Sequence, residues 1–179
     1  MQNPITQMDK ETQFKAAVEA NKDRIFRICC CYVRDEMERG DVYQEVLIHI
    51  WEGLDRFEEK SRVSTWIYRI AVNTCLGYVR TQNRRRKVFD EHSSIHEETL
   101  PDDASTEAAE EAEREIKLLY DSIHQLLPVE KTLVSLYLED VSSAEMADIV
   151  GISESNVRVK LHRIKKKLKE MMERDDHGS

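Results

Sequence analysis

Glycine and proline are scarce in this chain, with only five and three residues among 179. Long stretches rich in Ala, Leu, Glu, Lys and Arg take their place, and these residues favour helix over strand. The sequence contains no glycine-rich loop of the kind that cradles nucleotide phosphates. We therefore expect an all-α protein, and its 40% apolar and 35% charged residues suit two small helical domains better than one large core.

Cysteines and long apolar runs are also few. Of the four cysteines, Cys29, Cys30 and Cys31 are consecutive, a spacing that suits neither a tetrahedral zinc site nor a disulfide framework. No apolar run approaches the roughly 20 residues that a membrane span requires, and residues 1–30 lack an apolar signal segment. We expect reduced thiols in a cytoplasmic protein that is neither secreted nor inserted into a membrane.

Residue patterns typical of catalysis and metal binding are missing as well. The six histidines are scattered, and no His-Glu-x-x-His motif occurs. His92 and His96 lie four residues apart, but in a linker that secures neither their orientation nor their burial. An enzyme acting on nucleic acid should offer clustered carboxylates or a nucleophile with its base, and we find neither. We expect no catalytic residues, no metal, no cofactor and no small-molecule substrate.

The net charge of −8 conceals blocks of opposite sign. Residues 60–88 contain eight basic residues and no acidic one, and residues 158–169 contain seven basic residues and no acidic one. Between them, residues 90–115 hold eleven acidic residues and one basic. Two cationic segments around an anionic connector predict contact with phosphate at two places.

The spacing of apolar residues predicts three helices in a first domain, residues 9–88. The first helix covers about Asp9–Val33, and Arg39-Gly40 is expected to separate it from a second over about Asp41–Phe57. Ser64 is placed to cap the third.

The second predicted helix carries a polar patch on the face that its apolar residues do not occupy. Asp41, Gln44 and Glu45 lie at i, i+3 and i+4, and so share one side of the helix. By default, three such residues form a solvated surface, and only the motifs around them indicate a binding role.

The third predicted helix carries cations and one aromatic ring opposite its core side. Its stripe recurs every three or four residues and consists of Trp66, Arg69, Asn73, Gly77, Arg80 and Arg84. Arginine binds phosphate, and an indole can stack on unpaired bases. A helix face that carries both is typical of proteins that bind single-stranded nucleic acid. An isolated tryptophan is more often a core residue, so Trp66 has two open interpretations.

Residues 89–105, acidic and rich in Ser and Thr, have the composition of a linker. Helical spacing resumes in a second domain, residues 106–174, where Pro128–Glu139 is expected to form a helix with Leu133, Leu136 and Tyr137 on its core face.

The sharpest local signal lies in residues 142–172. Ser142 and Glu145 form a capping box, Gly151 is placed to end a short helix, and Ser153 is placed to cap a longer one. The longer helix combines an apolar stripe with many basic residues, so the segment predicts a helix-turn-helix. The alternative is an ordinary basic surface helix, but the capped helix and the turn before it favour DNA recognition.

Two parts of the sequence resemble the extracytoplasmic-function (ECF) sigma factors of the sigma-70 family. Residues 41–45 (DVYQE), followed by Trp51, and residues 64–73 (STWIYRIAVN) are similar to region 2 of that family. Residues 151–163 (GISESNVRVKLHR) are similar to the helix-turn-helix of its region 4. Val63 stands where many members carry an aromatic residue, so the preferred minus-ten sequence stays open.

The resemblance implies a bacterial transcription initiation factor that binds core RNA polymerase and promoter DNA and is inhibited by an anti-sigma factor. Asp41, Gln44 and Glu45 would bind the polymerase. The implied minus-ten contacts are Arg62, Ser64, Trp66, Arg69, Asn73, Arg80 and Arg84. The implied minus-thirty-five contacts are Glu154, Ser155, Asn156, Arg158, Lys160 and Arg163.

The main alternative is a stand-alone helix-turn-helix regulator whose first domain binds a ligand or dimerises. It accounts only for the second half of the chain, because such a regulator needs neither a second basic helix nor the polar patch joined to it.

Overall fold

The computed structural model describes residues 4–58, 61–88 and 107–176. Within these ranges the chain is helical and contains no strand, which confirms the all-α prediction. The elements are α1 (Pro4–Glu19), α2 (Lys22–Cys30), α3 (Glu36–Gly53), a 3-10 turn (Leu54–Arg56), α4 (Val63–Val88), α5 (Glu107–His124), α6 (Pro128–Leu138), α7 (Ser143–Val150) and α8 (Glu154–Asp176). The expected acidic linker, with His92 and His96, lies outside the described residues. In the described part of the chain, no helix has both the length and the apolar character needed to cross a bilayer.

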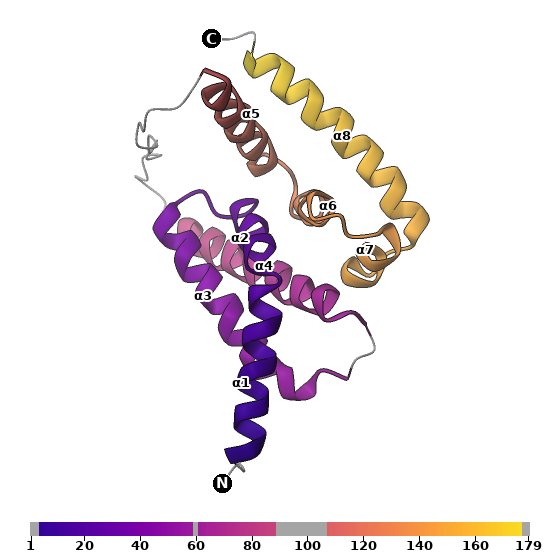
Figure 1. The fold of residues 1–179 in the computed structure, drawn as a ribbon. Helices are drawn as coiled ribbons and strands as arrows, with labels where there is room; N and C mark the ends of the chain where they lie inside the picture. Colours follow the sequence, from indigo (N-terminus) through magenta and orange to yellow (C-terminus); the bar gives the residue numbers. More distant parts are fainter. Residues whose placement is uncertain (1–3, 59–60, 89–106, 177–179) are drawn as a thin grey trace.

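The elements form two groups, α1–α4 and α5–α8, as Figure 1 shows. In the first group α2 and α3 pack against α4, and in the second α5, α6 and α7 all contact α8. The two small helical domains that the sequence predicts are therefore present.

The predicted single helix over Asp9–Val33 is wrong, because the chain breaks between α1 and α2. Asn21, 6% exposed, ends one helix and begins the next. Its side-chain amide donates a 2.8 Å hydrogen bond to the Ala17 carbonyl, and its amide oxygen accepts a 3.0 Å bond from the Tyr68 hydroxyl. A contact with α4, distant in sequence, thus fixes a break that apolar spacing does not reveal.

Two other predicted helix boundaries are also wrong. The second predicted helix begins earlier, at Glu36, because Asp35 caps it by accepting a 2.8 Å hydrogen bond from the Glu38 backbone N–H. Gly40 lies inside this helix and does not end the preceding one. The third predicted helix begins at Val63, so Ser64 lies within its first turn and does not cap it.

The helix-turn-helix signals are confirmed in α7 and α8. Ser142 and Glu145 form the expected capping box, with the Glu145 backbone N–H 3.3 Å from the Ser142 hydroxyl and the Ser142 N–H 3.2 Å from the Glu145 carboxylate. Gly151 ends α7 at φ 77°, a left-handed conformation that suits glycine. The Ser153 hydroxyl then accepts a 3.3 Å bond from the Asn156 N–H and caps α8.

One apolar cluster runs through both domains. In the first domain it is built on Ile25, Ile28, Val46, Ile50 and Ile67, and in the second on Ile123, Leu133, Leu136, Met146 and Ile164, all less than 2% exposed. The predicted core position of Tyr137 is wrong. It is 41% exposed, and its ring lies under the Lys165 ammonium at 4.0 Å.

Candidate nucleic-acid and polymerase interface

The α3 patch (Asp41, Gln44 and Glu45) is exposed on one side of α3. The opposite side of the helix is anchored by Val42, Val46 and Ile50, which are no more than 2% exposed. Burial of this apolar face therefore fixes the direction in which the patch points.

Sequence reasoning missed Ile48, which continues the α3 patch. It follows Gln44 and Glu45 by four and three residues, so it lies on the same side of the helix. Its side chain is 55% exposed. The signal was available in the sequence, since Ile48 falls outside the periodicity of the buried residues.

The stripe on α4 is mostly exposed. Arg69, Asn73, Arg80 and Arg84 face solvent, and Arg62 is exposed just before the helix begins. These guanidinium groups give one side of the helix a positive charge that can contact a phosphate backbone.

Trp66 is half-buried and packs against the end of α3. Its ring centroid lies 5.0 Å from that of Phe57, and a Cβ atom at Gly53 would come within 2.9 Å of its indole. The close approach of α4 to the end of α3 therefore depends on the absence of a side chain at Gly53.

A groove of about 650 Å³ lies between α3 and α4 and joins the α3 patch to the α4 stripe. Glu45 and His49 line one wall, and Asn73 and Arg85 line the other. The His49 Nδ1 lies 2.9 Å from the Thr74 hydroxyl, a contact that ties the two helices together.

The wall of this groove also includes Tyr78. Its hydroxyl donates to the Glu38 carboxylate, which also accepts a 3.0 Å bond from Gln82. Burial, with Glu38 close by, raises the pKa of Tyr78 to about 12, so this hydroxyl stays protonated at neutral pH.

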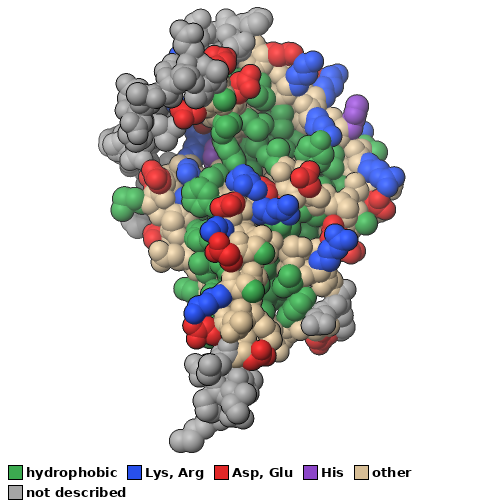
Figure 2. Space-filling view, in the orientation of Figure 1, with side chains coloured by type: hydrophobic (Ala, Val, Ile, Leu, Met, Phe, Trp, Pro, Cys, Tyr) green, Lys and Arg blue, Asp and Glu red, His purple; other side chains and the backbone are tan. Residues whose placement is uncertain are grey.

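Helix α8, the second helix of the helix-turn-helix, presents its polar side over its first half. Ser155, Asn156, Arg158 and Arg163 are exposed, whereas Glu154 and Lys160 are half-buried. The opposite side of the helix is anchored by buried residues, namely Val157, Leu161, Ile164 and Leu168. Figure 2 shows Lys and Arg side chains along the rim of the molecule where α8 runs in Figure 1.

Two contacts join α4 to α7. The Thr65 hydroxyl donates a 2.6 Å hydrogen bond to the Glu145 carboxylate, and the Arg69 guanidinium donates a 3.1 Å bond to the Asp148 carbonyl. The hydroxyl groups of Thr65 and Ser142 lower the pKa of Glu145, so this carboxylate is ionised at neutral pH.

Known families match both domains. The profile of Sigma-70 region 2 matches residues 17–85, and that of Sigma-70 region 4 matches residues 116–168. Together they match more than half of the chain.

Curated relatives match over most of their length. The ECF RNA polymerase sigma factor SigW of Bacillus subtilis is 25% identical, and the match covers 94% of each protein. The ECF RNA polymerase sigma-E factor of Haemophilus influenzae is 29% identical, and the match covers 89% of this chain and 86% of that protein.

Two solved structures share the fold. CnrH in complex with the cytosolic domain of CnrY has a TM-score of 0.64 at 19% identity, covering 92% of this chain and 90% of CnrH. The sigma factor RpoE of Bartonella quintana, in complex with the anti-sigma factor NepR, has a TM-score of 0.67 at 17% identity, covering 92% and 97%. The order of the two domains, the helix-turn-helix and the relatives agree: this chain belongs to the sigma-70 family, in its extracytoplasmic-function group, and is a transcription initiation factor that directs RNA polymerase to promoters.

Proposed function

We propose that this protein acts by binding alone, in the cytoplasm, with each domain serving a different contact. The first domain, residues 9–88, binds core RNA polymerase through the α3 patch and binds the minus-ten element through α4. The second domain, residues 106–174, binds the minus-thirty-five element through the start of α8. The protein contributes promoter specificity and carries out no catalysis itself.

The geometry of α7 and α8 carries this proposal. A capping box holds α7, the left-handed turn at Gly151 redirects the chain, and Ser153 begins α8 with a cap. In a helix-turn-helix, the first residues of the second helix enter the major groove. Ser155 and Asn156 occupy that position and are exposed, so their hydroxyl and amide groups are available to base edges.

The polymerase contact can be tested by size-exclusion chromatography of the purified protein with bacterial core RNA polymerase. The double variant Asp41→Ala/Glu45→Ala removes two exposed carboxylates from the α3 patch. The matched control, Glu170→Ala/Glu173→Ala, removes two exposed carboxylates from the last turns of α8, where they pair with Lys166 and Lys169.

We expect the control to co-elute with the polymerase as the wild type does, and the α3 variant to elute free. Co-elution of both variants would contradict the assignment of the α3 patch. Failure of the wild type to co-elute at micromolar concentration would instead favour the stand-alone regulator. The assignment as a stand-alone regulator explains fewer features, because it gives no role to the α3 patch or to the basic side of α4.

We also infer an anti-sigma partner for this chain. Among the relatives of similar fold, RpoE of Bartonella quintana forms a complex with an anti-sigma factor. Co-purification from the native host, followed by mass spectrometry, tests this inference. An inhibitory protein should be recovered with the free chain and should be absent from the chain bound to polymerase.

A further inference from the structure

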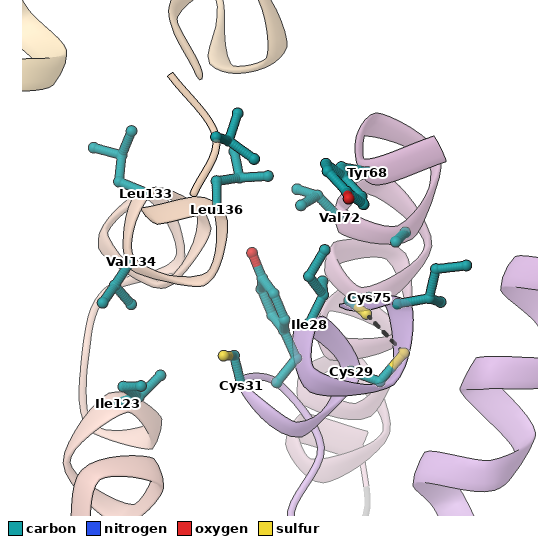
Figure 3. Packing of buried hydrophobic residues seen from close by; sticks show 14 of the residues in the cluster. Ile28, Cys29, Cys31, Tyr68, Val72, Cys75, Ile123, Leu133, Val134 and Leu136 are labelled. Carbon is teal, nitrogen blue, oxygen red and sulfur yellow. Dashed lines mark hydrogen bonds between the residues drawn. The ribbon is translucent and has the colours of Figure 1, made fainter. Parts of the chain in front are cut away.

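Helix α8 carries an exposed apolar side chain, Val159, in its first half. Val159 is 50% exposed. By contrast, Val72 and Val134 are no more than 3% exposed and lie among other apolar side chains of the core in Figure 3. Among the described residues, Val159 belongs neither to the buried apolar cluster nor to the half-buried residues packed against it. Its methyl groups are therefore available to a partner.

The periodicity of α8 places Val159 at the centre of the exposed side. Val157 and Leu161, the residues two positions before and after it, are both buried. Two positions correspond to about 200° of rotation around an α-helix, so Val159 points almost directly away from both. Ile164 and Leu168, farther along, continue the buried side. The valine thus lies opposite the apolar stripe that anchors α8.

Polar and cationic side chains surround Val159 on this exposed side. Ser155 and Asn156 lie one turn before it, His162 and Arg163 lie one turn after it, and all four are exposed. A hydroxyl and an amide can bond to base edges, and a guanidinium can bond to a base or a phosphate. Val159 is the apolar member of a surface whose other members suit the major groove.

Helix stability does not account for a valine at this position. Valine is β-branched, which restricts its side chain in a helix, and Lys, Arg, Glu or Ala would all favour the helix more. Single apolar residues are common on protein surfaces, so exposure alone indicates no function. The position of Val159 within the surface described above is what indicates a contact with DNA.

In the major groove, the apolar group that a base edge presents is the C5 methyl of thymine. We propose that Val159 contacts a thymine methyl group in the minus-thirty-five element and so makes one thymine–adenine pair a determinant of promoter choice. This inference rests on the proposed function of α8 and names a base that α8 recognises. The contact is made by side-chain methyl groups, so it discriminates without forming a hydrogen bond.

Replacement of thymine by uracil tests the contact, because it removes the methyl group and keeps the hydrogen-bonding groups of the base. The holoenzyme, reconstituted from the full chain and bacterial core RNA polymerase, first selects duplexes from a random library, and sequencing identifies the upstream element. Each thymine of that element is then replaced by uracil, one at a time. Competition against the labelled selected duplex, followed by fluorescence anisotropy, measures the affinity of each duplex for the holoenzyme.

The variant Val159→Ala removes the methyl groups that make the proposed contact. The matched control is Val129→Ala, the same substitution at a 40% exposed valine in the first turn of α6. At one thymine, we expect uracil to weaken binding of the wild type and of Val129→Ala about fourfold, the factor for burial of one methylene-sized group. Val159→Ala should bind the two duplexes with nearly equal affinity. Because alanine favours the helix, thermal unfolding should show that this variant stays folded.

A selected upstream element without thymine would overturn the inference, and so would equal discrimination against uracil in Val159→Ala and the wild type. Arg163→Ala, measured in the same way, separates this failure from failure of the proposed function. If Arg163→Ala weakens binding of the selected duplex while Val159→Ala behaves as the wild type, α8 binds DNA and only the role of Val159 is wrong. If neither variant changes the affinity, the proposed function of α8 is wrong as well.

Discussion

The hydroxyl of Thr65 lies 2.6 Å from the carboxylate of Glu145, so a residue in the first turn of α4 is bonded to the capping box of the helix-turn-helix. Glu145 also accepts a 2.7 Å bond from the Ser142 hydroxyl and a 3.2 Å bond from its N–H. A single carboxylate thus serves both the local cap of α7 and the contact between domains.

The variant Thr65→Val tests this bond, because valine keeps the shape of threonine and removes the donor. We expect the free energy of unfolding to fall by about 1.5–3 kcal/mol, the value of a hydrogen bond to a charged group, because the Glu145 carboxylate is ionised. Urea unfolding followed by circular dichroism measures it. Thr65→Ser, which keeps the donor, should lose less. If the free energy of unfolding falls more in Thr65→Ser than in Thr65→Val, the effect comes from the loss of the threonine methyl group and not from the loss of the hydrogen bond.

Glycine substitutions should change stability in opposite directions at two positions. Gly151→Ala places a side chain at φ 77° and should lower the free energy of unfolding by about 1 kcal/mol, because left-handed backbone is costly for residues with a Cβ atom. Gly40→Ala lies inside α3, where a Cβ atom meets nothing within 4 Å, and should raise it by about 0.5–1 kcal/mol. Thermal unfolding compares the two, and a loss at both positions would contradict the helical environment assigned to Gly40.

Acidification should destabilise the protein through His124. Burial, reinforced by the charges of Arg34, Lys131 and Arg39, lowers the pKa of His124 from 6.5 to about 3, although a hydrogen bond with the Cys30 backbone opposes the shift. Between these two values the unfolded chain binds a proton that the folded chain does not, so stability falls as the pH falls from 6.5 toward 3.

His124→Gln should therefore flatten the pH dependence of the free energy of unfolding in this window. Urea titrations at several pH values measure the slope. The control is His162→Gln, which makes the same substitution at an exposed position on α8. Equal slopes in His124→Gln and the wild type would show that another group dominates. Glu145, whose pKa is lowered, contributes separately, through a loss of stability below its ordinary value of 4.5.

The sequence predicted those parts of the fold whose causes are local. The capping box at Ser142, the turn at Gly151 and the cap at Ser153 each depend on neighbours within a few residues, and all three are confirmed. The break at Asn21 was missed because its partner, Tyr68, is 47 residues away. Gly40 was wrongly expected to end a helix, since one glycine costs only about 1 kcal/mol, which packing of the helix overcomes.

The contact between the domains was beyond sequence reasoning for the same reason. Glu139 and Arg27 are separated by 112 residues, and neither belongs to a motif. The sequence did predict charge and helical face, and so it placed the α3 patch and the arginines of α4 on exposed surfaces. It did not indicate which part of α4 the second domain covers, because that depends on how two separately predicted units pack together.

Salt dependence distinguishes the first half of α8 from its second half. Arg163→Ala removes an exposed cation from the proposed minus-thirty-five contact, whereas Lys169→Ala removes one six residues later, where it pairs with Glu173. Each phosphate neutralised releases counterions, so loss of one phosphate contact should reduce the slope of log affinity against log salt by about 1. Anisotropy titrations of the full chain with a labelled duplex at several salt concentrations measure this slope. We expect the change in Arg163→Ala and a slope like the wild type's in Lys169→Ala. Equal changes in both variants would mean that α8 attracts DNA along its whole length through its overall positive charge. The recognition role of its first half would then have to be abandoned.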